Sequence, residues 1–235
     1  MIEQLVEEVK KAHQGAFFTL AITGSVSVGK STLAEMLAVQ LEETGLKTAI
    51  VSTDDFLKNN ARLHEEGIFE QKGFPVSYDL EKLSSFIENF QDGVEKQSLA
   101  AYSQNMADIV DGQEKTVEKP DVLLLEGVVA LQLDSSLLDL TVFLEADINH
   151  IKDWYLQRNL LATVKSVDEP KSWRNQYVNL SLVDFYNVAM DVWEKTNQKN
   201  YDEYILPSKK QADWVLTFDY FHQPDNLTVG PRHII

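Results

Sequence analysis

Residues 24–32 read GSVSVGKST, which matches the phosphate-binding pattern G-x-x-x-x-G-K-[ST]. The apolar run FFTLAI at 17–22 precedes this motif and is typical of a central strand that is buried on both faces. Leu33, Leu37 and Leu41 follow it at the spacing of one helix face. A glycine-rich turn between a buried strand and a helix lets backbone N–H groups and the helix N-terminus bind phosphate oxygens. The sequence therefore predicts a P-loop that binds a nucleotide.

Two side chains of this P-loop have specific expected tasks. Lys30 is expected to reach the β- and γ-phosphates, and the hydroxyl of Ser31 suits Mg²⁺. The residues predicted to bind the nucleotide are Gly24, Ser25, Val26, Ser27, Val28, Gly29, Lys30, Ser31 and Thr32.

Strand and helix patterns alternate along the rest of the chain. Strands are predicted at 17–22, 47–52, 122–125, 140–145 and 212–218, and helices at 2–13, 33–45, 80–90, 147–161 and 176–197. Residues 58–79 are expected to be irregular, and the C-terminal tail is expected to be loosely held. Such alternation predicts an α/β fold with a doubly wound, mostly parallel sheet and ligands at the carboxyl ends of the strands. We expect one P-loop domain over 1–235, with an N-terminal helix at 1–14 and a lid-like segment at about 159–175.

The composition excludes several classes of protein. The formal net charge of −16 disfavours nucleic acid and anionic membrane as partners, since both need a basic surface. The absence of cysteine excludes disulfides and thiol catalysis. The acidic N-terminus does not resemble a signal peptide, and no apolar run approaches the roughly 20 residues of a membrane span. A cytoplasmic protein is therefore expected. The five histidines show no metal-ligand spacing and are expected at the surface.

Two acidic residues follow predicted strands that should end beside the P-loop. Asp54 follows the strand at 47–52, and Glu126 follows the strand at 122–125. An aspartate there can accept the proton of an attacking hydroxyl, and an acid after a buried strand can hold Mg²⁺. Asp55 is a rival for the role of base, and spacing alone does not separate the two. Neither an Asn-Lys-x-Asp motif of GTPases nor a Leu-Ser-Gly-Gly-Gln-like signature of transporter ATPases is present, which favours a small-molecule kinase.

The P-loop followed by STDDFL at 52–57 resembles bacterial type I pantothenate kinase, of the uridine kinase and phosphoribulokinase group. The resemblance covers roughly residues 17–218. It continues through KGFPVSYD at 72–79, YS at 102–103, KPDVLLLEG at 119–127, WYLQR at 154–158, WEKTN at 193–197 and ILPS at 205–208.

This resemblance implies that ATP phosphorylates the primary hydroxyl of pantothenate, with Mg²⁺ as cofactor. Asp54 would be the base, Lys30 and Ser31 would serve the nucleotide and metal, and Glu126 would help to hold the metal. Arg158 would meet the transferring phosphoryl group. The resemblance also suggests a homodimer. The residues expected to contact the small-molecule alcohol are Tyr102, Gln104, Tyr155 and Asn197.

The chain departs from the family pattern on the acceptor side and on the P-loop helix. Gln104 replaces a histidine, Glu35 an arginine, Ala162 a phenylalanine and Val129 an asparagine. A glutamate in place of an arginine predicts weaker binding of a polyanion such as coenzyme A. Two alternatives to pantothenate phosphorylation follow: a kinase of a nucleoside or sugar such as uridine, and a nucleotide-binding regulator without catalysis.

Overall fold

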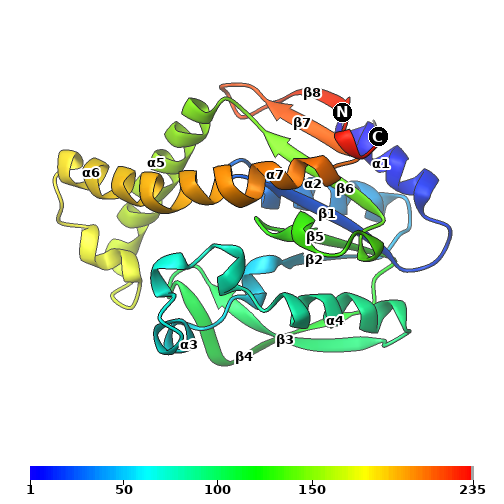
Figure 1. The fold of residues 1–235 in the computed structure, drawn as a ribbon, viewed down its shortest axis with the longest axis horizontal. Helices are drawn as coiled ribbons and strands as arrows, with labels where there is room; N and C mark the ends of the chain where they lie inside the picture. Colours follow the sequence, from blue (N-terminus) through cyan, green and yellow to red (C-terminus); the bar gives the residue numbers. More distant parts are fainter. Residues whose placement is uncertain (234–235) are drawn as a thin grey trace.

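Strand β1 (Phe18–Gly24) lies near the middle of the sheet, and all of its residues are buried. In the computed structural model, which describes residues 1–233, six strands form one sheet in the order β2-β5-β1-β6-β7-β8 (Figure 1). All neighbouring pairs from β2 to β7 are parallel, and β8 runs antiparallel to β7. The other strands are β2 (Thr48–Ser52), β5 (Val122–Glu126), β6 (Leu140–Glu145), β7 (Trp214–Phe218) and β8 (Pro224–Val229). The predicted mostly parallel α/β sheet is confirmed.

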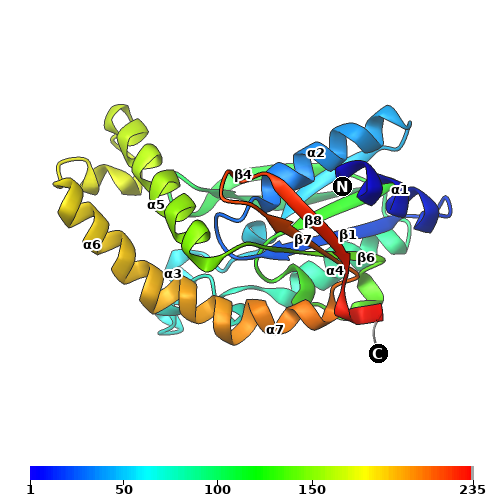
Figure 2. The same ribbon diagram turned by 90° about the horizontal axis from the view of Figure 1, so that it is seen from above.

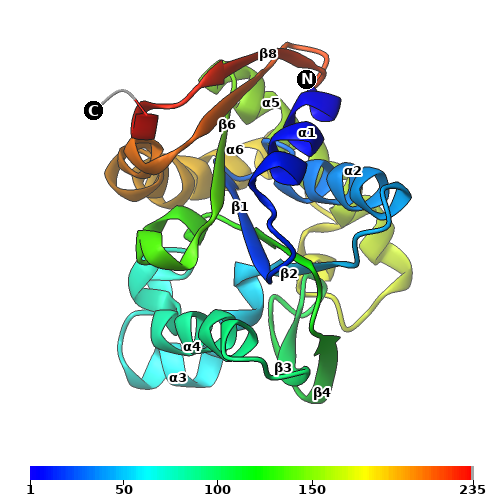
Figure 3. The same cartoon turned by 90° about the vertical axis from the view of Figure 1, so that its right-hand side faces the viewer.

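Helices cover both faces of this sheet, as Figures 2 and 3 show. Helices α1 (Ile2–Ala12) and α2 (Lys30–Glu43) lie on one face, and α4 (Leu80–Gln91) lies on the other. Successive residues of a strand point to opposite faces. Leu20 and Ile22 therefore join the core beneath α1 and α2, whereas Ala21 joins the core beneath α4. Burial on both faces explains why β1 reads as a continuous apolar run.

A two-stranded hairpin, which the sequence patterns did not reveal, lies beside β2 and α4 (Figure 1). Its strands β3 (Lys96–Ser103) and β4 (Asp108–Glu118) pair in antiparallel fashion. The segment before α4, which was expected to be irregular, also contains the short helix α3 (Asn60–Glu65). The side chain of Asn59 caps α3 by accepting a hydrogen bond of 2.9 Å from the backbone N–H of Arg62.

Two helical segments run longer than the patterns predicted: α5 leaves the carboxyl end of β6, and the segment from α6 to α7 returns towards the start of β7 (Figure 1). Helix α5 (Ile148–Lys165) begins after its predicted cap Asp147, whose carboxylate accepts the N–H of Asn149 at 2.8 Å, and continues past residue 161. Helix α6 (Leu182–Val192) begins later than expected. The chain then stays helical beyond 197, through π-helical turns at Trp193–Gln198 and Tyr201–Ile205 and through α7 (Leu206–Ser208).

The prediction of a loosely held C-terminal tail is wrong for residues 224–229, and residues 234–235 lie outside the described part of the chain. Residues of β8 pair with β7 from Trp214↔Val229 to Phe218↔Pro224 and close the edge of the sheet. Within residues 1–233, no helix has both the length and the apolar character needed to cross a membrane.

Candidate active site

The P-loop connects the end of β1 to the start of α2, as predicted, and its backbone requires glycine at the strand end. Gly24 has a φ of 146°, and a Cβ atom there would lie 2.5 Å from the carbonyl oxygen of Leu144 on β6. Ser27 and Gly29 also have positive φ values, 62° and 105°, so the chain curls around the first turn of α2. Successive N–H groups in such a curl form a concave anion-binding site.

Lys30 lies across this loop. Its ammonium group donates to the carbonyl oxygens of Gly24 at 3.2 Å and Ser25 at 2.8 Å. Burial lowers the pKa of Lys30 to about 8, although the carboxylates of Glu126 and Asp54 act in the opposite direction. The lysine is therefore already held among the groups that the sequence assigned to phosphate binding.

Ser31 and Glu126 meet where α2 begins and β5 ends. The Ser31 hydroxyl donates to a carboxylate oxygen of Glu126 at 3.1 Å, and Glu126 is 8% exposed. A hydroxyl beside a carboxylate is an oxygen donor set that suits Mg²⁺, which is usually held by one or two protein ligands and substrate phosphates. Among residues 1–233 there is no cluster of three or more histidine, aspartate or glutamate side chains that could hold a metal on its own. Ser31 and Glu126 therefore fit a metal that arrives with a nucleotide.

Asp54 occupies a 3₁₀ turn, Thr53–Phe56, directly after β2. One of its carboxylate oxygens accepts the Tyr78 hydroxyl at 3.2 Å, and the other accepts the side-chain amide of Gln104 at 3.4 Å. Burial raises the pKa of Asp54, the negative charge of Glu126 raises it further, and Lys30 opposes the shift. This carboxylate thus lies between the phosphate side and the predicted acceptor side.

The carboxylate of Asp55, the rival candidate, is occupied by contacts within the protein. It is 6% exposed, accepts the backbone N–H of Tyr102 at 3.0 Å and forms an ion pair with Lys115 of β4. These contacts anchor the β3–β4 hairpin to the turn after β2. The geometry therefore favours Asp54 over Asp55 as the group that faces a reacting hydroxyl.

The four predicted acceptor residues come from three different elements. Tyr102 is the penultimate residue of β3, and Gln104 lies in the turn of the same hairpin. Tyr155 lies on α5, with its ring 5.2 Å from that of Trp193, and Asn197 lies in the π-helical turn that follows α6. Since π-helical turns often occur at functional sites, this π-helical turn is consistent with a binding role for Asn197.

Electrostatic influences connect these residues to the arginine of α5. Burial raises the pKa of Tyr155, and Asn197 and Arg158 oppose the shift. The positive charge of Arg158 also acts to lower the pKa of Lys30. The charge of Arg158 therefore acts on both the P-loop lysine and Tyr155, and its role at the phosphoryl group stays a prediction.

The lid-like segment predicted at about 159–175 packs against the hairpin turn. The carbonyl oxygen of Gln104 accepts the Trp173 indole N–H at 3.1 Å and the Arg174 guanidinium at 2.9 Å. The backbone N–H of Trp173 donates to the carbonyl of Asn105 at 2.9 Å, and the Asn105 amide donates to Glu169 at 2.6 Å. These contacts hold the lid-like segment against the turn that carries Gln104.

Sequence reasoning missed three nearby side chains. Tyr78 lies in the KGFPVSYD segment that carried part of the resemblance, but its hydrogen bond to Asp54 had no sequence signal of its own. His222, expected at the surface, is part-buried, as are His13 and His150, and it stacks on Trp154 with ring centres 3.9 Å apart. A Cβ atom at Gly29 would lie 3.0 Å from its Nε2 atom. Arg174 is the third.

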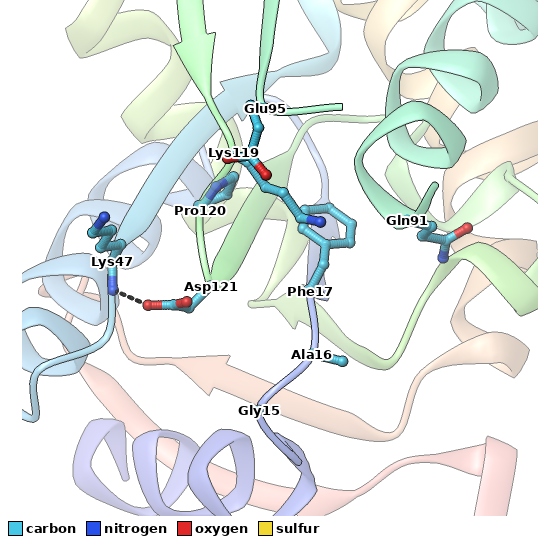
Figure 4. A pocket seen from close by; sticks show the side chains of 9 residues that line it. All are labelled: Gly15, Ala16, Phe17, Lys47, Gln91, Glu95, Lys119, Pro120 and Asp121. Carbon is cyan, nitrogen blue, oxygen red and sulfur yellow. Dashed lines mark hydrogen bonds between the residues drawn. The ribbon is translucent and has the colours of Figure 1, made fainter. Parts of the chain in front are cut away.

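A separate pocket lies at the opposite end of the sheet (Figure 4). Its lining includes Phe17, Lys47 and Asp121, which directly precede β1, β2 and β5, and the backbone N–H of Lys47 donates to Asp121 at 2.8 Å. None of the predicted site residues lines this pocket. It is therefore distinct from the candidate site at the carboxyl ends of the strands.

Comparisons with known proteins agree with this geometry. The model of the phosphoribulokinase / uridine kinase family matches residues 19–169. The pantothenate kinase of Enterococcus faecalis is 36% identical over 219 residues, which are 89% of this chain and 71% of that protein. The pantothenate kinase of Rhodococcus opacus is 36% identical over 225 residues, 93% of this chain and 73% of that protein. A candidate fructose transport system kinase from Silicibacter sp. TM1040 shares the fold, with a TM-score of 0.69, 20% identity and coverage of 86% and 92% of the two chains.

Proposed function

Because the chain belongs to the phosphoribulokinase / uridine kinase family, we propose that it transfers the γ-phosphoryl group of ATP to the primary hydroxyl of pantothenate. The predicted resemblance to bacterial pantothenate kinases is confirmed by identities of 34–36% over about nine tenths of the chain. The chain is thus an ATP-dependent small-molecule kinase, and pantothenate is the acceptor that its relatives support.

One observation supports this assignment from the structure itself. Asp54 lies at the junction of two sets of groups: Lys30 and Glu126 influence its pKa from the phosphate side, while Tyr78 and Gln104 bind it from the acceptor side. A kinase needs a carboxylate at this junction, because the attacking hydroxyl must meet the γ-phosphate there. A nucleotide-binding regulator has no such requirement.

In the proposed reaction, Asp54 orients the pantothenate hydroxyl and accepts its proton as the new O–P bond forms, while the bond from the γ-phosphorus to the β–γ bridging oxygen breaks and ADP leaves with that oxygen. Phosphoryl transfer depends mainly on positioning and on stabilising the charge of the transferring group. Lys30 would stabilise the β- and γ-phosphate oxygens, and Arg158 would stabilise the phosphoryl group from α5. Tyr102, Tyr155 and Asn197 would hold the acceptor so that its hydroxyl points at Asp54.

A magnesium ion is part of this proposal. Ser31 and Glu126 would hold it, since their oxygens lie 3.1 Å apart at the mouth of the P-loop. When bound, Mg²⁺ would supply positive charge that stabilises the phosphate groups of ATP. We also propose that the chain works as one kinase unit and as a homodimer. Light scattering of the purified protein would test the second point, and a monomeric mass at micromolar concentration would contradict it.

An acceptor panel in an ADP-release assay tests the assignment. Purified protein with ATP and MgCl₂ is given pantothenate, uridine, fructose or no acceptor. We expect ADP release above the acceptor-free rate with pantothenate, and little with the other two. Turnover of uridine without turnover of pantothenate would overturn the proposed acceptor. ATP binding with no turnover of any acceptor would favour the regulator.

A further inference from the structure

Arg174 is a buried cation whose charge is not matched by the protein. Its side chain is 8% exposed, and its guanidinium carbon lies 4.6 Å from the centre of the Trp173 ring. One guanidinium nitrogen donates to the Gln104 carbonyl at 2.9 Å, while the buried Nε has no hydrogen-bond partner. Among the side chains that the structure describes, no carboxylate forms an ion pair with Arg174.

Such an arrangement is unfavourable in the free protein. A buried charge is normally paired, and a buried donor without an acceptor loses hydration that it does not regain. The carbonyl of Gln104 and the face of Trp173 compensate only part of this loss. A ligand with a negative group would supply the missing acceptors.

The position of Arg174 indicates that this ligand is the acceptor substrate. Gln104 links it to the reacting carboxylate, because its carbonyl holds Arg174 while its side-chain amide donates to Asp54 at 3.4 Å. The groups that influence its charge are Arg158, Tyr102 and Tyr155. Two of them, Tyr102 and Tyr155, are predicted acceptor residues, which agrees with the Gln104 contact in placing Arg174 beside the acceptor.

We propose that Arg174 binds a carboxylate of the acceptor substrate, at the end opposite to the hydroxyl that faces Asp54. This inference rests on the proposed function and adds a specificity residue to it. A guanidinium can bind a carboxylate through two parallel N–H···O bonds, and Nε with its neighbouring NH₂ group forms such an edge. Pantothenate has the required form, with a primary hydroxyl at one end and a carboxylate at the other.

A local positive charge would allow an anionic acceptor to bind to a chain that is acidic as a whole. The chain carries a net charge of −16, which disfavours an anionic acceptor at long range. Only four arginines occur in the sequence, and of these Arg174 donates to the carbonyl of Gln104, a predicted acceptor residue. Arg158 has the proposed task at the phosphoryl group. Lys72 lies 5.4 Å from the centre of the Tyr102 ring, but its ammonium group already donates to Asn60 and to the Ala107 carbonyl, whereas Arg174 keeps an unused donor.

The test compares matched acceptors that differ only in this charge. Pantothenol, in which a hydroxymethyl group replaces the carboxylate, is measured beside pantothenate with the parent protein and Arg174→Gln. We expect kcat/KM for pantothenate to fall about 10- to 100-fold in Arg174→Gln, mainly through KM, while kcat/KM for pantothenol stays nearly unchanged. If Arg174 only held the lid in place, Arg174→Gln would lower kcat/KM equally for both acceptors. Arg62→Gln, at a half-exposed arginine on α3, is the matched control and should leave the ratio unchanged.

The outcomes separate this inference from the proposed function. If pantothenate is phosphorylated but Arg174→Gln leaves the ratio between the two acceptors unchanged, the inference is overturned and the function stands. If the parent protein instead phosphorylates glycerate in preference to glycerol, and Arg174→Gln removes that preference, the inference stands without pantothenate. Turnover of neutral alcohols alone overturns both. If the glutamine variant does not fold, Arg174→Lys is used in its place. Its melting temperature and its ATP affinity show whether it is folded. In a folded lysine variant, an unchanged kcat/KM for pantothenate would also overturn the inference.

Discussion

Replacing Asp54 by asparagine should separate chemistry from nucleotide binding. The variant keeps the size of the side chain but cannot accept a proton, and a general base contributes about 10²- to 10⁴-fold to the rate. We therefore expect kcat with pantothenate to fall by that factor. ATP affinity should change by less than about threefold, because the hydrogen bonds of Asp54 run to Tyr78 and Gln104 and not to the P-loop.

The same variant should also stabilise the free protein at neutral pH. The folded-state pKa of Asp54 is raised, so its contribution to stability is present below the ordinary aspartate pKa and is lost as the pH rises through the folded value. Asparagine does not ionise and avoids this loss. The melting temperature of Asp54→Asn without nucleotide should exceed that of the parent at pH 7, by about 2–4 °C for each kcal/mol, and the difference should shrink at acid pH.

Asp55→Asn is the matched control one residue away. It removes the ion pair with Lys115 and weakens the contact with the backbone of Tyr102. We expect a lower melting temperature, with a loss of about 1–3 kcal/mol in the free energy of unfolding, and most of the kcat retained. Steady-state ADP release, ATP titration calorimetry and thermal melts measure all three quantities. An Asp54→Asn protein that keeps most of its rate, or a folded Asp55→Asn protein that loses it, would refute the assignment of the base.

Three further outcomes follow from the P-loop and from α5. Gly24→Ala should lose ATP binding in calorimetry, because its φ of 146° and the Leu144 carbonyl 2.5 Å from the new Cβ force the loop to move; normal ATP affinity would contradict this. Because Lys30 has a pKa of about 8 without nucleotide, ATP should bind with uptake of a proton above that pH, so its Kd should rise as the pH increases. Calorimetry in two buffers of different ionisation enthalpy measures this uptake, and a Kd that is constant to pH 9.5 would argue against it. Arg158→Met should lower kcat by about 10³-fold or more with ATP affinity nearly unchanged. Rapid-quench kinetics measure the chemical step, and an unchanged rate of that step would contradict this role of Arg158.

The parts of the fold that were predictable are those in which local sequence and burial agree. Strands β1 and β5 are buried on both faces, so their apolar runs are visible without any tertiary information. The P-loop motif then fixes which end of the sheet carries the site. In the hairpin the pattern fails, because most of its described side chains are exposed or part-buried and only Leu99 and Val117 join the core.

The same distinction applies to the candidate site. Asp54 and Asp55 are chemically identical neighbours, and only the contacts of Asp55 with Lys115 and Tyr102, both from the unpredicted hairpin, separate them. Arg174 could not be identified either, since its burial depends on the packing of the lid-like segment against Gln104. Residues whose role depends on tertiary contacts between distant segments leave no periodic trace in the sequence.

Phosphorus NMR of the complete reaction tests the central claim most directly. Parent protein, ATP, MgCl₂ and pantothenate are followed together, with Asp54→Asn as the inactive control. The account predicts that the γ-phosphorus signal of ATP is replaced, one for one, by a phosphomonoester signal on pantothenate's primary hydroxyl, and that ADP accumulates equally. Inorganic phosphate as the only new phosphorus product besides ADP, or no loss of ATP at all, would contradict it.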